Sequence, residues 1–359
     1  AVVLDDLVNA YAGGSTGNTD MDAVIAALGA MTTNQQVSDA VTQMLPLMTG
    51  SMAQFSLANL HSLNRVVQAW QERNRGLSSG DDFVTDRKIW LKPLGSWADQ
   101  EDRDGAFGYE AQTYGVMLGA DGELSKKSRI GAAFAYTHSQ VDSNSGDQTA
   151  DVSSYLAVLY GSRSLDENTE FNWRVDYAYN QNEGDRYIAF VDRTARSSYG
   201  SDSFHLGARI GRTIPMSEKT RFTPSVRADY AMIKEDGYTE TGADALNLVV
   251  DGRTTDELIL AVDGKLEHAV SETSTLTADL GIGYDTQAEQ ASITSSFAGG
   301  GAAFVTDGID ASPVVVRGGL GMVINPGEAM EITARYDIGS RPGSGYTGQT
   351  VSVKFQMAF

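Results

Sequence analysis

Apolar and polar side chains alternate along most of this chain, from about residue 82 to its end. In residues 171–179, one face carries Phe171, Trp173, Val175, Tyr177 and Tyr179, with Asn172, Arg174, Asp176 and Ala178 between them. A period of two places alternate side chains on opposite faces of a β-strand. Further segments of this kind give centres near residues 92, 116, 134, 157, 175, 206, 226, 262, 280, 318, 334 and 354. The pattern therefore predicts twelve strands.

The connections between these strands are short and long in turn. The short ones are 121–128, 163–169, 214–219, 270–274 and 325–328, and the long ones are 99–110, 139–150, 180–197, 233–252, 285–310 and 339–348. Outer-membrane barrels have an even number of antiparallel strands, short periplasmic turns and longer external loops. A soluble sandwich, the main alternative, gives no reason for this alternation. We predict an all-β, twelve-stranded antiparallel transmembrane β-barrel over residues 83–359.

The kinds of residue on the two faces also favour a membrane barrel. The polar faces carry charges and glycines, where the core of a sandwich would need aliphatic side chains. Tyrosine, tryptophan and phenylalanine gather on the apolar faces near strand ends, as in membrane girdles. The mean hydropathy of −0.25 is typical of a soluble protein, but a barrel exposes only alternate residues to lipid. The chain has no run of about 18 apolar residues, so the sequence predicts no membrane-spanning helix.

The first part of the chain has helical periodicity instead. Apolar residues recur at helical spacing over 37–48, and Thr33 with Gln36 matches a capping box. A shorter helix is predicted over 22–28 and a long one over 52–75. The polar residues of the long helix are spread around its circumference, which is unusual for a helix in an ordinary core.

The long helix is the predicted occupant of the barrel lumen, since it directly precedes the first strand. A twelve-stranded barrel is wider than an eight-stranded one and narrower than a porin, so one helix fits with water around it. We expect its Asn64, Arg65, Arg73 and Arg75 to contact the wall, where pairing lowers the cost of enclosed charge. The inward carboxylates available to them are Asp176, Asp229, Asp263, Asp279, Glu331 and Asp337. A solvated periplasmic linker is the alternative for this helix.

Composition and motifs argue against several other functions. The formal net charge is −20, which disfavours a nucleic-acid partner, and the absence of cysteine suits an oxidising periplasm. The four histidines have no metal-binding spacing, and residues 13–17 (GGSTG) lie in a linker, whereas a nucleophile elbow joins a strand to a helix. We predict no cofactor, no metal and no catalytic site. An outer-membrane protease or lipase, or a plugged porin-like channel, remains the alternative.

Three segments resemble autotransporter β-domains. They read IWLKPLGSWADQEDRDGAFGY at 89–109, YGVMLGADG at 114–122 and GYTETGADALNLVVDG at 237–252. The resemblance, over about residues 52–359, is to the monomeric translocators of type V secretion. It implies a barrel with a helix in its pore that exports and anchors an N-terminal passenger on a Gram-negative outer membrane. Residues 1–50 would be a helical linker or passenger remnant, 51–82 the pore helix and its link to the first strand, and 83–359 the barrel.

The resemblance also gives a role to the last strand, VSVKFQMAF, which we expect beside the first. Val353, Phe355, Met357 and Phe359 match the signal read by the barrel assembly machinery, and an unpaired strand suits β-augmentation. The other expected partners of this monomer are outer-membrane lipid, periplasmic chaperones and its own passenger. Ala1–Asp6 has no signal-peptide features, so we expect an exported chain to have lost an upstream portion.

Some members of the family cut themselves at an asparagine of the pore helix. Asn59, Asn64 and Asn74 are candidates by residue type alone, and each would need a lumen carboxylate beside it. An intact helix is the expectation.

Overall fold

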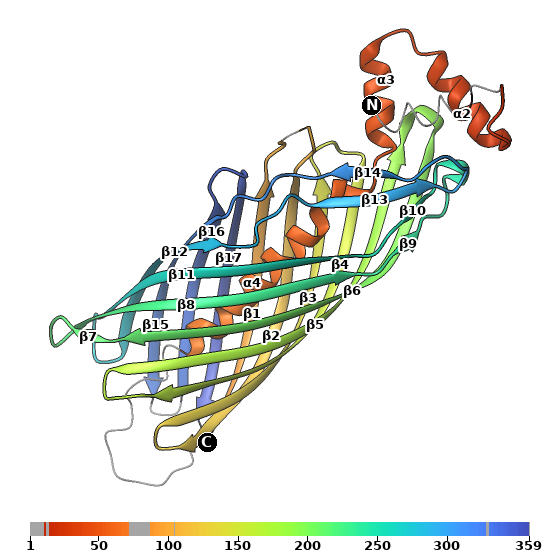
Figure 1. The fold of residues 1–359 in the computed structure, drawn as a ribbon. Helices are drawn as coiled ribbons and strands as arrows, with labels where there is room; N and C mark the ends of the chain where they lie inside the picture. The colour runs from red at the N-terminus through yellow and green to blue at the C-terminus, as the bar shows by residue number, and fades with distance from the viewer. Residues whose placement is uncertain (1–10, 12–13, 72–86, 104, 328–329, 359) are drawn as a thin grey trace.

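The computed structural model describes residues 11, 14–71, 87–103, 105–327 and 330–358. Twelve long antiparallel strands close into a barrel (Figure 1), because β1 pairs with β17 and β8 pairs with β11. The strands are β1 (Lys88–Gln100), β2 (Tyr109–Ser125), β3 (Ser128–Ser143), β4 (Gln148–Ser164), β5 (Thr169–Ile188), β6 (Arg193–Arg212), β8 (Thr220–Glu235), β11 (Arg253–Ala269), β12 (Ser274–Asp285), β15 (Val314–Gly327), β16 (Met330–Arg341) and β17 (Tyr346–Ala358). The predicted fold class and strand number are confirmed.

The two ends of the barrel differ in their connections. One end, called the turn end, has the connections 126–127, 165–168, 213–219 (with the two-residue β7, Ile214–Pro215) and 270–273. The other, called the loop end, has 101–108, 144–147, 189–192, 236–252, 286–313 and 342–345. The connections lie at the predicted ends, but the predicted difference in length holds only in part. The connections 144–147, 189–192 and 342–345 are as short as those of the turn end, and the clearly long ones are 236–252 and 286–313. The first and last strands meet at the turn end, where Ile89 pairs with Met357.

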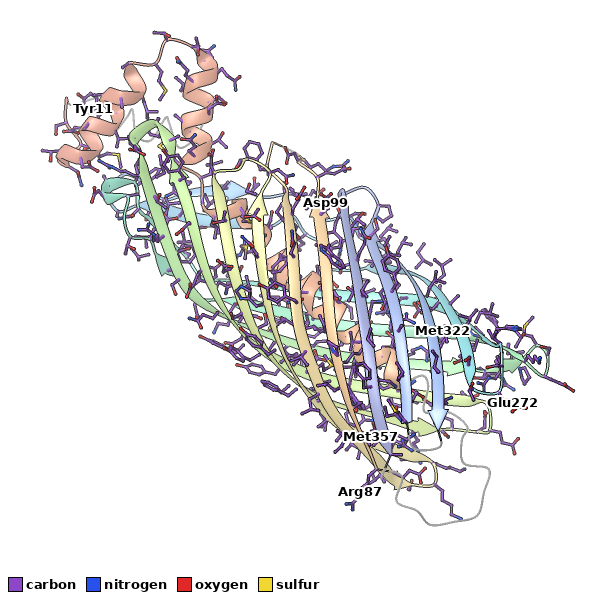
Figure 2. All side chains as sticks on the ribbon, turned by 180° about the vertical axis from the view of Figure 1, so that it is seen from behind. Tyr11, Arg87, Asp99, Glu272, Met322 and Met357 are labelled. Atoms are coloured by element: carbon purple, nitrogen blue, oxygen red, sulfur yellow. The ribbon has the colours of Figure 1, made fainter. Side chains whose placement is uncertain are left out.

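The outer surface of the barrel has an apolar band, and it is polar between this band and the loop end. In β5 the outward residues from Phe171 to Tyr179 are all aromatic or aliphatic, and nine residues match the ~9–11 needed to cross a bilayer. Beyond Tyr179 the outward residues are Gln181, Glu183 and Asp185. Figure 2 shows side chains covering the outer surface, including Met322 and Met357, with Asp99 at the loop end and Glu272 at the turn end.

Several predicted loops are strands that continue beyond this apolar band. Residues 180–197 were predicted as a long loop, but β5 and β6 stay paired from Asn180 with Ser201 to Ile188 with Arg193. A four-residue connection with the short helix η2 (Ala189–Val191) joins them. The prediction was wrong because the outward face here is polar, so alternation ends while backbone pairing continues.

A second, smaller sheet lies over the loop end. It consists of β9 (Tyr238–Thr239), β10 (Leu248–Val250), β13 (Ser292–Phe297) and β14 (Phe304–Asp307), in the order β14-β13-β10-β9. The short helix η3 (Asp244–Leu246) precedes β10. Sequence periodicity could not reveal strands this short, and the segments that contain them, 233–252 and 285–310, were predicted as loops. We call these four strands the loop sheet.

In the described part of the chain, three α-helices precede the barrel. Helix α2 (Thr19–Gly29) and helix α3 (Asn34–Gln43) lie outside the barrel at the loop end, and α4 (Ser51–Gln71) runs down the lumen (Figure 1). The capping box of Thr33 and Gln36 is present. Helix α3 ends earlier than the predicted residue 48, because Pro46 disfavours helical backbone in the residue before it; a short 3₁₀ helix, η1 (Leu47–Gly50), leads into α4. Within the described ranges, no helix is long and apolar enough to cross a membrane.

Candidate functional site

The lumen around α4 has two unlike halves. On one side, Leu57, Leu60, Leu63, Val66 and Val67 of the helix pack against an apolar wall. This wall comes mainly from β1–β4 and contains Trp90, Leu94, Met117, Ala133, Ala135, Leu156, Val158 and Tyr160. Sequence analysis missed it by treating the lumen face as polar throughout. The signal was the nearly unbroken apolar run LAVLY at 156–160, which indicates a strand buried on both faces.

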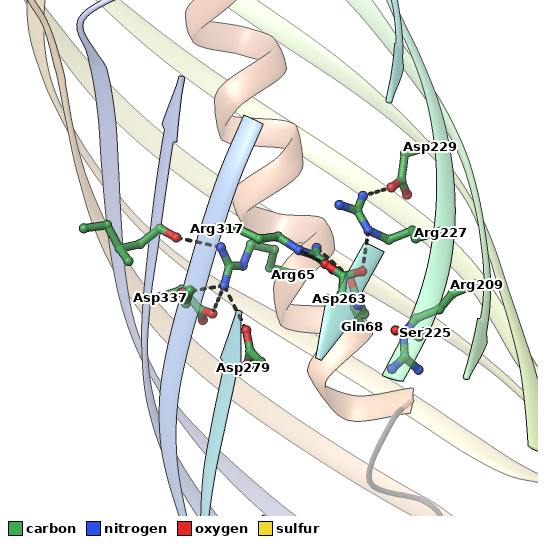
Figure 3. A network of polar contacts seen from close by, with 12 residues as sticks. Arg65, Gln68, Arg209, Ser225, Arg227, Asp229, Asp263, Asp279, Arg317 and Asp337 are labelled. Atoms are coloured by element: carbon green, nitrogen blue, oxygen red, sulfur yellow. Dashed lines mark hydrogen bonds and ion pairs between the residues drawn. The ribbon is translucent and has the colours of Figure 1, made fainter. Parts of the chain in front are cut away.

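Arg65 makes the most extensive contact between α4 and the polar wall. Its guanidinium donates to Asp337 Oδ1 at 2.6 Å and lies 3.5 Å from Asp279 Oδ2 (Figure 3). The same group donates to the carbonyl oxygens of Ile338, at 2.9 Å, and Gly318, at 2.7 Å. Arg335 also donates to both Asp279 and Asp337. The helix is therefore fixed to β12, β15 and β16 by one side chain.

A second contact joins α4 to a chain of buried groups on β5, β6 and β8. Asn64 Nδ2 donates to Asp176 Oδ1 at 3.0 Å, and Asp176 Oδ2 lies 2.8 Å from His205 Nδ1. The other ring nitrogen, His205 Nε2, lies 3.1 Å from Asp229 Oδ1. Arg174 Nη2 donates to the same oxygen at 2.7 Å. Both ring nitrogens of His205 thus contact carboxylates, and the arrangement holds charges in place and leaves neither nitrogen to activate a nucleophile.

A third contact continues this network across the lumen. Arg227 pairs with Asp229 and, at 3.4 Å, with Asp263. Arg317 Nε donates to Asp263 Oδ1 at 2.9 Å, and its Nη1 donates to Gln68 Oε1 of α4 at 3.0 Å (Figure 3). The sequence offered Asp263 as a partner for a helix arginine. Among the described residues, Asp263 pairs with the wall arginines Arg227 and Arg317, and Gln68 of the helix accepts from Arg317.

Towards the loop end, α4 contacts the wall through shorter side chains. His61 Nε2 lies 2.5 Å from Glu257 Oε1, and Arg341 pairs with the other oxygen of Glu257. Ser62 Oγ lies 2.7 Å from Thr350 Oγ1. These contacts come from β11, β16 and β17, so all parts of the polar wall hold the helix.

The turn end of α4 meets backbone carbonyls and lysines. Gln71 Nε2 donates to the carbonyl oxygens of Gly161 and Trp173, each at 2.9 Å. Lys92, Lys265 and Lys354 line a small cavity beside Val66 and Ala69 of the helix, where positive charge suits the negative end of the helix dipole. Glu331, predicted to face the helix, pairs with Lys354 in the wall. Arg73, Asn74 and Arg75 lie outside the described residues.

The terminal strand is paired along both edges. Val353 and Phe355 pair with Ala334 and Ile332 of β16, and β1 covers the opposite edge. Val353, Phe355 and Met357 point outward, with Met357 65% exposed. Phe359 lies outside the described residues. In the closed barrel this strand has no free edge, so any capture of it must come before closure.

A cavity of about 500 Å³ remains between α4 and the loop-end half of the polar wall. Asn59, His61, Tyr109, Glu257 and Arg341 are among the residues that line it. The amide oxygen of Asn59 is buried there without a hydrogen-bond partner. Across the described residues, no group of three or more histidine, cysteine or acidic side chains is arranged to hold a metal ion. The geometry is that of a channel filled by a helix.

A protein family and individual outer membrane proteins are similar to this chain. A family model described as the autotransporter β-domain matches residues 89–337. Outer membrane protein A of Rickettsia rickettsii is 28% identical over 321 residues, which are 84% of this chain and 14% of that protein. Outer membrane protein B of Rickettsia prowazekii (strain Madrid E) is 27% identical over 200 residues, which are 53% of this chain and 12% of that protein. The chain thus spans a small part of the curated relatives that it matches.

Solved structures share the fold. The translocator domain of the autotransporter NalP from Neisseria meningitidis has a TM-score of 0.69 at 17% identity, covering 85% of this chain and 98% of that one. The β domain of the Bordetella autotransporter BrkA has a TM-score of 0.53 at 11% identity, covering 76% of this chain and 100% of that one. At these identities the likeness concerns the fold alone.

Proposed function

The chain belongs to the autotransporter β-domain family, and on that basis we propose that it exports an N-terminal passenger and anchors it at the cell surface. It is a β-barrel of the Gram-negative outer membrane, and the family match does not favour the enzyme and channel alternatives. By the usual orientation, the turn end faces the periplasm and the loop end faces outward.

The path of α4 is the observation that carries this proposal. The helix enters the lumen at the loop end and descends towards the turn end, where β1 begins (Figure 1). The described helices that precede α4, α2 and α3, lie at the loop end of the barrel (Figure 1). A passenger attached upstream would lie there too, joined to the membrane through the helix. We propose the division into residues 1–50 as linker or passenger remnant, 51–82 as pore segment and 83–359 as barrel.

Display of a tagged passenger tests this function. A signal peptide and an epitope-tagged domain are placed before Ala1, and whole cells are treated with protease or antibody from outside. We expect a surface-exposed tag when the barrel is inserted. A matched chain without 51–71 should insert and leave the tag inside. A tag that stays periplasmic above a correctly inserted full-length barrel contradicts export.

We further propose that α4 remains uncut. Asn64 is the candidate with a carboxylate nearby, since its amide nitrogen lies 3.0 Å from Asp176 Oδ1. The amide oxygen of Asn59 is buried with no hydrogen-bond partner among the described residues. Asn64 lies inside a regular helix, and Asp176 is already shared with His205. We expect the intact mass of the refolded chain, with no fragment beginning at Arg65. A fragment that disappears in Asp176→Asn would show cleavage instead.

The proposed partners follow from the closed barrel. We propose that periplasmic chaperones keep the unfolded chain soluble, that the barrel assembly machinery captures the last strand before it pairs with β1, and that the product is a monomer in lipid. Deleting Phe359 should lower the yield of heat-modifiable barrel in the membrane fraction. Glu272→Ala, in an exposed turn, is the control. Equal yields would argue against a role for the terminal phenylalanine.

A further inference from the structure

The segment before α4 is docked on the loop sheet through an apolar core. We call residues 18–45, which contain α2 and α3, the clamp. It contributes the buried residues Met21, Val24, Leu28, Ala40 and Met44 to this core. The barrel contributes Ile188, Ala195, Ala243, Ala245, Leu246, Leu248, Val250, Ile293, Phe297 and Phe304. Each half of the core covers the other and excludes water from it.

An ion pair with fixed geometry adds to this contact. Arg193, at the start of β6, donates to the two carboxylate oxygens of Asp20 at 2.6 and 2.8 Å. The backbone N–H of Ala245 donates to the same carboxylate at 3.0 Å. Two-point pairing of arginine with a carboxylate gives orientation as well as attraction. The first turn of α2 is therefore placed on β6 and η3 together.

A second arginine joins the end of α3 to the barrel. Arg186 Nη1 donates to the carbonyl oxygen of Gln43 at 2.6 Å, and its Nη2 donates to the carbonyl oxygen of Leu246 at 3.0 Å. Arg186 also pairs with Glu240, and both side chains are only 1% exposed. Gln43 Oε1 accepts from the backbone N–H of Ala189 at 2.9 Å. The C-terminal end of α3 is thus held by the buried side chain of Arg186 and by a backbone N–H in η2.

The connection from the clamp to α4 is also buried. Leu47, Met48, Met52 and Phe55 pack against Tyr109, Ala111, Val141, Ala150 and Val152 of the barrel wall. Met48 has a φ of 47°, and its backbone N–H donates to the side chain of Gln148. A non-glycine residue keeps such a φ only where its surroundings enforce it. Movement of the clamp would therefore reach α4 directly.

We propose that the clamp is an extracellular lock: once it has crossed the pore, it folds onto the loop sheet and holds α4 in the lumen. Each of its helices has its own N-cap, at Asn18 and Thr33. Helices of 11 and 10 residues are marginal on their own, so we expect docking on the loop sheet to complete their folding. The lumen is filled by a single helix, so the pair cannot return while folded. The placement of the clamp outside the cell rests on the proposed export function. Its docking on the loop sheet does not.

The test uses the full chain, refolded in detergent and reconstituted into planar bilayers. Arg193→Ala removes the ion pair, and Met21→Asp places a charge in the core, where Met21 is 1% exposed. Asp39→Ala is the matched control, because Asp39 is exposed and accepts a hydrogen bond from the exposed Gln35 of the same helix. Heat-modifiable gel mobility verifies that every barrel is closed.

We expect two readouts to change together in Arg193→Ala and Met21→Asp. Amide hydrogen exchange of α2 and α3 should accelerate by about tenfold in Arg193→Ala, the factor that loss of a hydrogen bond between charged groups produces. It should accelerate at least as much in Met21→Asp, which places a charge in the apolar core. The rate of spontaneous channel openings should rise by a similar factor of about ten, with Asp39→Ala unchanged. Faster exchange with an unchanged opening rate overturns the lock, and so does unchanged exchange in both variants. No passenger is present, so this result is independent of the display experiment.

Discussion

Single residues in the lumen rarely depend on one partner. Asp337 accepts from both Arg65 and Arg335, and Asp229 contacts His205, Arg174 and Arg227. Sequence alternation could place these side chains inward, because a face is set by position parity. It could not say which of them meet, because that depends on the register of strands far apart in the chain and on the rotation of α4.

Arg65→Met tests how much the principal contact of α4 contributes to stability. The change removes bonds to Asp337, Gly318 and Ile338. Since Arg335 still pairs with Asp337, we expect a loss of about 1–3 kcal/mol in the free energy of unfolding. Breaking a buried pair with no substitute typically costs more, about 3–5 kcal/mol.

Urea unfolding in detergent micelles, followed by tryptophan fluorescence, measures this loss. Arg65→Lys keeps the charge but has a single donor nitrogen. Its unfolding midpoint should lie between those of the unmodified chain and Arg65→Met. An unchanged midpoint in Arg65→Met would show that the contacts of Arg65 do not contribute to stability.

The Asp20–Arg193 pair makes clamp docking dependent on pH. The hydrogen bond from Arg193 lowers the pKa of Asp20 below its ordinary value. A carboxyl whose pKa is lower in the docked state contributes stability above its free value, near 3.9, and loses it as pH falls through the docked value. We therefore expect exchange of α2 to be constant from about pH 5 upward and to accelerate below about pH 4.

Amide hydrogen-exchange rates of α2, corrected for the intrinsic effect of pH on exchange, measure this dependence. The same measurement on Asp20→Asn is the comparison. The asparagine variant should exchange faster at neutral pH and lose the acidic step. A step of the same size in both proteins would assign the acid sensitivity to another group.

Elements were predictable where one physical signal dominated them. Period-two alternation identified the twelve barrel strands, because lipid and lumen impose opposite demands on alternate residues. The ends of β5 and β6 were missed because both faces are polar there. The loop sheet was missed because its strands have two to six residues. Its central pairing, of β10 with β13, also joins residues more than forty positions apart, such as Leu248 and Phe297.

Gly184 in β5 marks where the clamp connection meets the barrel wall. A Cβ there would overlap the side chain of Leu47 and approach Ser197 Oγ at 2.9 Å. Leu47 is 3% exposed, so it has little room to yield. We expect Gly184→Ala to cost about 1–3 kcal/mol, as overpacking does, and to accelerate hydrogen exchange over 44–55.

Gly339→Ala in β16 is the matched control, because a Cβ there meets nothing within 4 Å. It should be neutral or slightly stabilising, since alanine has less freedom to lose than glycine. Equal behaviour of the two variants would show that the wall at Leu47 is loosely packed.

At the scale of the whole molecule, the sequence predicted a helix in the lumen from its position and its polar residues. It did not predict that half of the lumen is apolar, or that the segment before the helix folds back onto the barrel. Both features arise from contacts between distant parts of the chain, and together they lead us to expect a closed channel. The turn-end half is packed by Val66, Trp90 and Leu156, and the remaining cavity lies towards the loop end.

Conductance in planar bilayers measures this closure. Because α4 contacts both halves of the wall, the full chain should pass little current, and a chain without residues 1–75 should conduct several-fold more, as wider barrels with empty lumens do. Gly339→Ala serves as a full-length control, since its lumen keeps α4. The deleted chain must first show heat-modifiable mobility, so that current through misfolded protein is excluded. If a closed barrel without the helix stays as silent as the full chain, the wall itself seals the channel, and α4 is a tether whose removal leaves the permeability of the outer membrane unchanged.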